Sequence, residues 1–308
     1  NFPMKLPDTL EVRCAGSAGR GIFAAKPICC GSLVLSEKPI MWCFNKAAKT
    51  LRCRACFITS SGTTVSCDEC GEAAWCSQEC REMDDARHAL ECALLKALAS
   101  LKVPLEVRQN VALLISLHAN RGSGADPFGT TDTLMREPPK RQGAKRRQRC
   151  QDEAWKIFGR LMQQVKPGSV GLHPIIPCTA ALTALGAMPL NAFGFWDGGD
   201  DDGCCLVPTC SFFNHSCEPN CLHRMEHGEV RFYALRDIAT DEELTFSYLD
   251  QEQVAPEVRK DLIFTSWDFH CSCTLCRREA QTERKVGATV SRKFVVSMGT
   301  VVRHQLED

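Results

Sequence analysis

FFNHSCEPNCLHR, residues 212–224, concentrates polar and metal-binding side chains within one short stretch. Cys217 and Cys221 are spaced so that, together with His215 or His223, they can close one small zinc site. The alternative is that these polar residues belong to different sites. The rest of the chain decides between the two interpretations.

The whole-chain composition sets few limits on function. The chain has 308 residues, with 37 Lys plus Arg and 37 Asp plus Glu. This length can bury an apolar core without metal ions to hold it together. The balanced charge gives no whole-protein field that favours nucleic acid or an anionic membrane, so binding sites must be sought locally.

Cysteine is unusually frequent, with 21 residues, and the first residues carry no apolar segment typical of a secretory signal. Together these features predict an intracellular, reducing setting, where cysteines bind metals more often than they form disulfides. We expect the protein in the nucleus, the cytoplasm or both.

An uncharged stretch over residues 167–196 is long enough to span a bilayer. Three prolines, Pro174, Pro177 and Pro189, interrupt it. Proline disrupts a helix interior, so the pattern favours a buried helix over residues 178–188, flanked by loops, in a soluble protein without membrane contact.

Apolar periodicity predicts a mixed chain of strands and helices. Strands are expected in two groups, first over 10–15, 22–28 and 32–44, and later over 221–225, 229–238 and 243–250. Helices are expected over 93–101, 104–121, 153–165, 178–188 and 256–264. Residues 122–149 are expected to form a mobile loop. Its basic run, Lys140–Arg149, suits a nuclear address, contact with phosphates, or a solvated loop.

Residues 53–92 hold a dense set of metal ligands. The motifs are CRAC (53–56), CDEC (67–70), CSQEC (76–80) and HALEC (88–92). Each short pair can place two donors on one ion, and another pair can complete a tetrahedron. Four pairs therefore predict two zinc sites.

A second constellation, CSCTLC, supplies three thiols, Cys271, Cys273 and Cys276. A closed structural zinc site needs a fourth ligand. Spacing alone leaves Cys217, Cys221 and a histidine such as His270 as candidates.

Taken together, these motifs resemble a known family. The block at 53–92 resembles a MYND zinc finger, and NHSCEPN (214–220), ELTFSYLD (243–250) and CSCTLC resemble a SET domain with its post-SET segment. A finger inserted into a SET domain resembles the SMYD protein-lysine methyltransferases, over roughly residues 10–280. The implied fold is mixed α+β: a mainly-β, pseudoknot-like SET fold of small sheets, with the finger and a helical insertion.

The resemblance implies a division of the chain. The expected parts are an N-terminal SET part (1–48), the MYND finger (49–93), a helical insertion (94–176) with the basic loop 122–149, the SET core (177–250), the post-SET zinc segment (251–280) and a tail (281–308). The tail is unlike the C-terminal helical-repeat domain of larger family members. Without that domain we expect a more open substrate cleft.

The resemblance also implies three zinc ions. Their expected ligand sets are Cys53, Cys56, Cys76 and Cys80; Cys67, Cys70, His88 and Cys92; and Cys217, Cys271, Cys273 and Cys276. Cys221 and His223 are then expected to be ordinary strand residues.

The methyl donor implied by the resemblance is S-adenosylmethionine. Its expected contacts are Gly19, Arg20, Gly21, Asn191, Asn214, His215, Tyr248 and Phe269. Tyr248 matches the catalytic tyrosine, and the lysine channel is expected between Phe193 and Trp267. Trp267 stands where the family has a second active-site tyrosine.

The expected function is methylation of a lysine on a histone tail or another protein, by a chain that acts as a monomer. Related MYND fingers bind proline-rich peptides, so the alternative is a non-catalytic scaffold in transcriptional regulation. A third hypothesis, nucleic-acid binding through Lys140–Arg149, is weakened by the neutral net charge and by the lack of aromatic residues in that run.

Overall fold

The computed structural model describes residues 6–45, 52–60, 64–121, 134–136, 140–165, 176–196, 201–249 and 255–286. The strands are β1 (Leu10–Cys14), β2 (Arg20–Ala24), β3 (Leu33–Glu37), β4 (Met41–Phe44), β5 (Val65–Ser66), β6 (Ala74–Trp75), β7 (Ala192–Trp196), β8 (Asp201–Leu206), β9 (Asn214–His215), β10 (Cys221–Glu226), β11 (Glu229–Ala234) and β12 (Glu243–Phe246). The helices are α1 (Gln78–Ala99), α2 (Leu105–Arg121), α4 (Ala144–Gln164), α5 (Cys178–Asn191), α6 (Pro256–Trp267) and α7 (Thr274–Val286).

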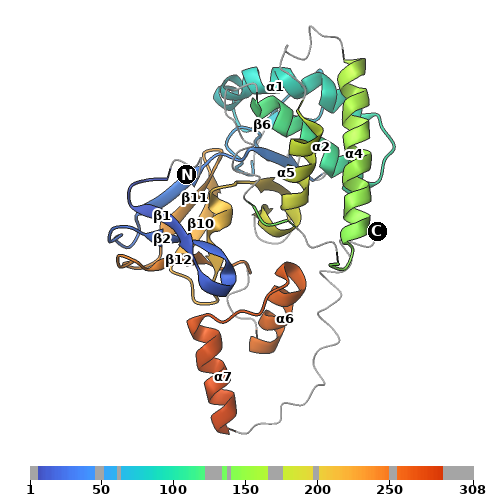
Figure 1. Ribbon diagram of the computed structural model, residues 1–308. Helices are drawn as coiled ribbons and strands as arrows, with labels where there is room; N and C mark the ends of the chain where they lie inside the picture. The colour runs from blue at the N-terminus through green and yellow to red at the C-terminus, as the bar shows by residue number, and fades with distance from the viewer. Residues whose placement is uncertain are drawn as a thin grey trace.

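The strands form small sheets, so the expected mixed α+β architecture is confirmed (Figure 1). Their orders are β1-β2-β12-β9, β10-β11-β3, β4-β8-β7 and β5-β6. In the first sheet β9 pairs in parallel with β12, and Thr245 lies opposite Asn214. A hairpin of another sheet, β10-β11, separates these two strands in sequence. This pairing brings the Asn-His pair next to the strand that leads to Tyr248.

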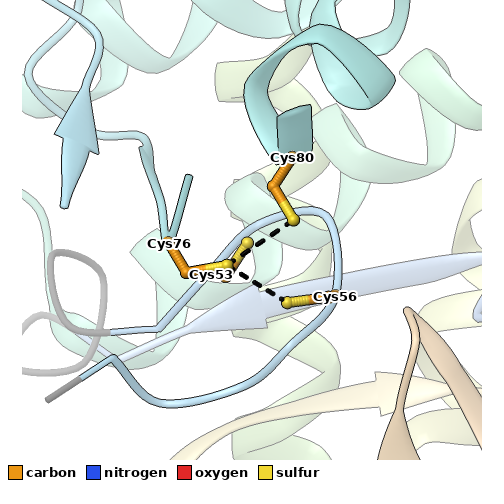
Figure 2. Close-up of side chains that lie close together, drawn as sticks. All are labelled: Cys53, Cys56, Cys76 and Cys80. Atoms are coloured by element: carbon orange, nitrogen blue, oxygen red, sulfur yellow. Dashed lines mark hydrogen bonds between the residues drawn. The ribbon is translucent and has the colours of Figure 1, made fainter. Parts of the chain in front are cut away.

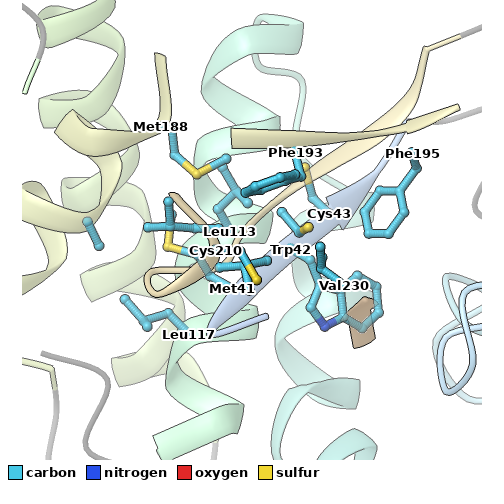
Figure 3. Close-up of a cluster of buried hydrophobic side chains, with 14 of the residues drawn as sticks. Met41, Trp42, Cys43, Leu113, Leu117, Met188, Phe193, Phe195, Cys210 and Val230 are labelled. Carbon is cyan, nitrogen blue, oxygen red and sulfur yellow. The ribbon is translucent and has the colours of Figure 1, made fainter. Parts of the chain in front are cut away.

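The core joins the helices to the β4-β8-β7 sheet (Figure 3). On β4, Met41 and Trp42 are almost fully buried. Leu113 and Leu117 of α2 and Phe193 and Phe195 of β7 are buried in the same cluster. Burial of large apolar side chains at about 1.5–3 kcal/mol each supplies the main favourable term for folding.

Helix α1 begins inside the cysteine-rich segment, where the Ser77 side chain caps it by accepting a hydrogen bond of 3.2 Å from Cys80 N. The helix then continues to Ala99, across the boundary expected between residues 93 and 94. The finger and the helical insertion therefore share one rigid element.

The basic run required a correction. Residues 144–149, expected in a loop, form the first turns of α4. Lys, Arg and Gln are good helix formers. In addition, a polar residue occupies part of the buried face of α4, since Gln151 donates a hydrogen bond of 3.1 Å to the carbonyl of Leu185. The apolar spacing therefore appears only later in the helix. Residues 122–133 of the expected loop lie outside the described residues, as does the tail from 287 onward.

Within the described part of the chain, no helix is long and apolar enough to cross a membrane. Helix α5 occupies the position predicted for the buried helix and extends to Asn191. Pro189 lies in its last turn.

Candidate active site and metal sites

A cavity of about 260 Å³ lies where three parts of the chain meet. The end of α5 and the start of β7 form one wall, β10 and the end of β12 form another, and the end of α6 contributes the third. The lining residues that matter for chemistry are Asn191, Phe193, His223, Phe246, Tyr248 and Trp267. Five aromatic side chains contribute to the lining, together with small residues and the polar residues Asn191, Ser211, His223 and Ser247.

Tyr248 is held by two hydrogen bonds. Its hydroxyl donates to the carbonyl of Phe213 at 2.9 Å, and its backbone N–H donates to His215 Nδ1 at 3.0 Å. Burial raises the pKa of Tyr248 above its usual value, and the charge of Glu243 acts in the same direction. The phenol is therefore a protonated, fixed group at neutral pH.

Aromatic rings surround Tyr248. The ring centroid of Phe246 lies 4.9 Å away and that of Trp267 lies 5.2 Å away. Phe193 stacks on Phe246 with centroids 5.7 Å apart. The two residues expected in the channel, Phe193 and Trp267, thus lie on the same cavity as the expected catalytic tyrosine.

The residues expected around the methyl donor separate into two groups. Asn191 lines the cavity, but its side-chain amide donates to the carbonyls of Met135 and Ala187, both at 2.8 Å. Tyr248 also lines the cavity, whereas the lining does not include Gly19, Arg20, Gly21, Asn214, His215 and Phe269.

Asn214 connects residues 19–21, the glycine-containing turn that leads into β2, to the sheet. Its side-chain nitrogen donates to the carbonyl of Arg20 at 3.0 Å and to Glu243 Oε1 at 2.7 Å. Gly21 permits this approach, since a Cβ there would lie 2.8 Å from that nitrogen and 2.5 Å from Glu243 Oε1. The Arg20 guanidinium lies over the ring of Phe212 at 4.8 Å. The turn is thereby fixed against β9 and β12.

The C-terminal segment adds Trp267 and Phe269 to the site. Asp268, between them, takes the left-handed conformation that ends α6, with φ of 62°. The ring of Phe269 lies 6.3 Å from that of His215 and 6.4 Å from that of Tyr248. The end of α6 is also held by Arg141, whose guanidinium donates to the carbonyls of Thr265, at 3.1 Å, and Ser266.

The predicted metal ligands form three clusters, in each of which four donor atoms lie within 4.8 Å of one another. In the first, which contains Cys53, Cys56, Cys76 and Cys80, Sγ–Sγ distances are 3.7 Å between Cys56 and Cys76 and 3.5 Å between Cys76 and Cys80 (Figure 2). A Zn–S bond of about 2.3 Å gives a tetrahedral edge of about 3.8 Å. The donor geometry therefore fits zinc.

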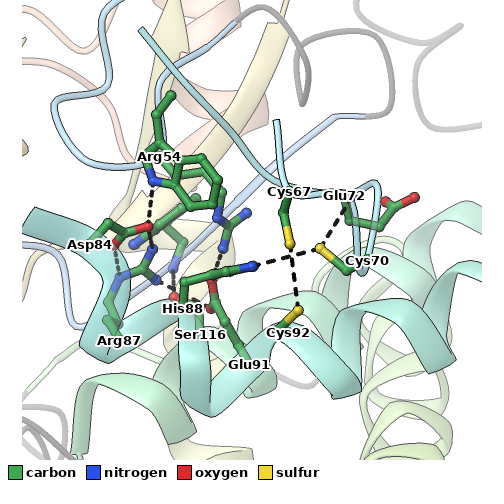
Figure 4. Close-up of polar contacts among 12 residues, drawn as sticks. Arg54, Cys67, Cys70, Glu72, Asp84, Arg87, His88, Glu91, Cys92 and Ser116 are labelled. Carbon is green, nitrogen blue, oxygen red and sulfur yellow. Dashed lines mark hydrogen bonds and ion pairs between the residues drawn. The ribbon is translucent and has the colours of Figure 1, made fainter. Parts of the chain in front are cut away.

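The second cluster joins CDEC to α1 (Figure 4). Cys67 Sγ lies 3.7 Å from Cys92 Sγ, and Cys70 Sγ lies 3.8 Å from His88 Nε2. The other ring nitrogen of His88 faces Glu91 at 3.6 Å. A carboxylate in this position orients a histidine ligand toward its metal.

Glu91 also anchors a buried charge network. It pairs with Arg54 and, at 3.2 Å, with Arg87. Although burial raises its pKa, these two guanidinium charges lower it to about 2. The same guanidinium groups lie 4.3 and 4.6 Å from the ring of Trp42 on β4, so the network attaches the finger to the core.

The finger touches the β10-β11 hairpin as well. The backbone N–H of Gly228 donates to the carbonyl of Cys56 at 3.1 Å. A side chain at Gly228 would lie 2.4 Å from the carbonyl oxygen of Ala55. Glycine is therefore required for this close approach.

The third cluster contains Cys217, Cys271, Cys273 and Cys276. Cys217 Sγ lies 3.8 Å from Cys271 Sγ and 3.6 Å from Cys276 Sγ. Cys221, on β10, is buried in the apolar core outside the described clusters. The motif 212–224 thus serves several sites. The prediction of a single zinc site within residues 212–224 is wrong, because Cys217 lies with cysteines more than fifty positions later in the chain.

A family model of the SET domain matches residues 19–249. The chain belongs to the SET domain family. The match covers the glycine-containing turn, the cysteine-rich segment, the Asn-His pair and Tyr248.

Curated SET proteins resemble the chain along most of its length. It is 25% identical to histone-lysine N-methyltransferase SMYD3 of Homo sapiens, over 89% of this chain and 62% of that protein. It is 27% identical to N-lysine methyltransferase SMYD2-A of Danio rerio, over 87% of this chain and 60% of that protein. The chain therefore spans about three fifths of the length of these relatives.

Among solved structures, a similar chain is the SET domain of LSMT bound to MeLysine and AdoHcy. It is 12% identical, with a TM-score of 0.41, and the match covers 87% of this chain and 54% of that one.

Sequence reasoning missed part of the SET site. His223 was expected to be an ordinary strand residue but lines the cavity, as do Phe213 and Phe246. Alternation along β10 and β12 shows which side chains share a face of a strand, but it does not show that the face borders a cavity. The residues around His223 in sequence, CLHRME, carry no signal of the aromatic cluster that it joins in the fold.

Proposed function

We propose that this chain is an S-adenosylmethionine-dependent protein-lysine N-methyltransferase. The observation that carries this proposal is the aromatic cavity beside a fixed, protonated Tyr248 in a SET family chain. The names of the curated relatives, which are lysine methyltransferases, support the same reaction.

The methyl donor fits the strip formed by the glycine-containing turn, β9 and Phe269. Gly21 lets the backbone close onto Asn214 and Glu243, and Gly19, with a φ of 82° that suits glycine, has open space where a Cβ would stand. We assign the donor to Gly19, Arg20, Gly21, Asn214 and His215, with Phe269 against its aromatic part. S-adenosylmethionine supplies an electrophilic methyl group.

The cavity lowers the cost of deprotonating the acceptor lysine. An unperturbed lysine pKa of about 10.4 makes deprotonation at pH 7 cost about 4.6 kcal/mol. Burial among Phe193, Phe246 and Trp267 disfavours the ammonium form and so lowers this cost. The lysine would reach its reactive, neutral form by losing its proton to solvent.

Tyr248 then positions the reacting amine. Since its pKa is raised, it does not act as a base at neutral pH. Its proton is directed at the carbonyl of Phe213, which leaves the phenol oxygen as a fixed dipole in the cavity wall. Fixed dipoles that need no reorganisation are an effective source of catalysis.

The deciding experiment measures cofactor binding and methyl transfer separately. Calorimetry should detect S-adenosylmethionine binding, and radiolabelled methyl transfer onto histones and cell extract, with mass spectrometry, should identify modified lysines. A chain that binds no S-adenosylmethionine, but binds a proline-rich peptide through its finger, would instead be a scaffold.

A further inference from the structure

His223 occupies a position in the cavity wall that the reaction described above does not use. It lies on β10 with its ring among three phenylalanines. The centroid distances are 5.4 Å to Phe193, 5.3 Å to Phe246 and 5.7 Å to Phe232. Its neighbours Phe193 and Phe246 line the same cavity. A polar ring is thus built into an apolar wall.

The surroundings keep this ring neutral. Burial lowers the pKa of His223 to about 4, and none of its three ring contacts carries a charge. A neutral imidazole has one N–H donor and one unprotonated nitrogen that accepts. Within the described part of the chain, no group forms a hydrogen bond with this ring.

His223 is half-buried where it borders the cavity, so a ligand that fills the cavity removes water from its ring, and a ligand group that pairs with the ring gains binding selectivity. Other polar groups on the aromatic wall differ in what they offer. The indole of Trp267 is a donor only. The hydroxyl of Tyr248 donates to the carbonyl of Phe213 and keeps its oxygen as the fixed dipole assigned above to the reacting amine, so His223 offers an additional acceptor.

We propose that His223 determines specificity for the methyl-accepting amine, by accepting a hydrogen bond from an amine N–H through its unprotonated ring nitrogen. This inference rests on the proposed function of the cavity. A neutral lysine amine carries two N–H groups, a monomethylated amine carries one and a dimethylated amine carries none. The cavity therefore favours unmodified and monomethylated lysine over dimethylated lysine as acceptors.

The first test measures binding rather than turnover. The probes are Nα-acetyl-lysine methylamide and its Nε-monomethyl and Nε-dimethyl forms, added to the chain saturated with S-adenosylhomocysteine. We expect about three- to tenfold tighter binding of the unmodified probe than of the dimethyl probe, the range of one net hydrogen bond. In 15N-histidine spectra at pH 8, where the free amine is more populated, the unprotonated nitrogen of His223 should shift with the unmodified and monomethyl probes.

Substitutions of His223 distinguish the effect of its hydrogen-bond acceptor from the effect of the shape of its side chain. His223→Leu should abolish the preference between probes, and His223→Gln, which keeps an acceptor, should retain part of it. His227→Asn is the matched control, because His227 is exposed in the turn of the same hairpin, at a φ of 55° that asparagine tolerates. It should leave the preference unchanged.

The outcomes distinguish this inference from the proposed function. Methyl transfer with an equal probe preference in wild type and His223→Leu would overturn the role of His223 and leave the enzyme. A His223 shift and a probe preference without methyl transfer would support the binding role and refute the enzyme. No shift with any probe overturns the inference, and this measurement stands on the wild-type chain even if the variants fail to fold.

Discussion

The hydroxyl of Tyr248 donates its proton to the backbone carbonyl of Phe213, 35 residues earlier in the chain and 2.9 Å away. The bond crosses from the end of β12 to the residue just before β9. It fixes the ring that borders the cavity, and it ties the two strands on which the Asn-His pair and the tyrosine depend.

Replacing Tyr248 by Phe removes this bond and the phenol dipole while keeping the ring. We expect methyl transfer to fall about 100- to 1,000-fold, the range found when one preorganised dipole is removed, with little change in S-adenosylmethionine affinity. Single-turnover rates and calorimetry measure the two quantities. Tyr233→Phe is the control, since Tyr233 bonds to Glu226 away from the cavity. Equal losses of rate and affinity would mean that Tyr248 is structural.

Metal analysis should find three zinc ions per chain. Cys217→Ala should leave two, because it removes one donor of the third cluster. Cys221→Ala truncates the other cysteine of the same motif, which is buried in apolar surroundings, and should keep all three. Three zinc ions in Cys217→Ala and two in Cys221→Ala would contradict the assignment of ligands.

Glu91→Gln should destabilise the chain by about 3–5 kcal/mol. The substitution keeps the shape but leaves Arg54 buried without its negative partner, whereas Arg87 keeps its ion pair with Asp84 at 2.7 Å. Chemical denaturation monitored by circular dichroism gives the change. Glu69→Gln is the control: Glu69 pairs with Lys96 at 3.6 Å on the surface, and its loss should cost less than about 1 kcal/mol.

The neutral state of His223 predicts a pH dependence of stability. Its pKa is about 4 in the folded chain and 6.5 when unperturbed, so between these values the unfolded chain binds more protons at this residue. The free energy of unfolding should therefore rise with pH over this window and fall as pH drops through it. The contribution is about 2 kcal/mol between pH 5 and pH 6.5.

Urea unfolding at these two pH values should show this difference in wild type and lack it in His223→Asn. The zinc sites are the same in both proteins, so their acid sensitivity cancels in the comparison. His227→Asn should behave as wild type. If the two variants showed the same pH slope, the ring of His223 would not be buried as described.

Ligand spacing alone predicted two zinc sites within residues 53–92 and three ligands of a third, because the paired ligands are close in sequence and zinc accepts few donor types. The grouping of the four pairs came from the family resemblance. Cys217 required the family resemblance, since spacing alone left Cys221 and His270 open. The start of α4 was missed because polar residues such as Gln151 occupy part of its buried face. His223 was missed because the cavity forms only when β7, β10 and α6 meet, a tertiary arrangement absent from any local pattern.

Two separate parts of the chain form the cavity: the strands and α5 form most of its lining, and the end of α6 supplies Trp267. Trp267 and Phe269 arrive on the segment that carries α6 and α7, which Figure 1 shows below the sheets. That segment is attached beside the site through Cys217, two positions after His215, and through Arg141 on the carbonyls at the end of α6. Losing the zinc ion at Cys217 would therefore remove one of the two attachments of the segment that carries Trp267, while Phe193 on β7 would stay in place. In the proposed enzyme, loss of this zinc ion or oxidation of its thiols is therefore expected to lower methyl transfer without any change to Tyr248.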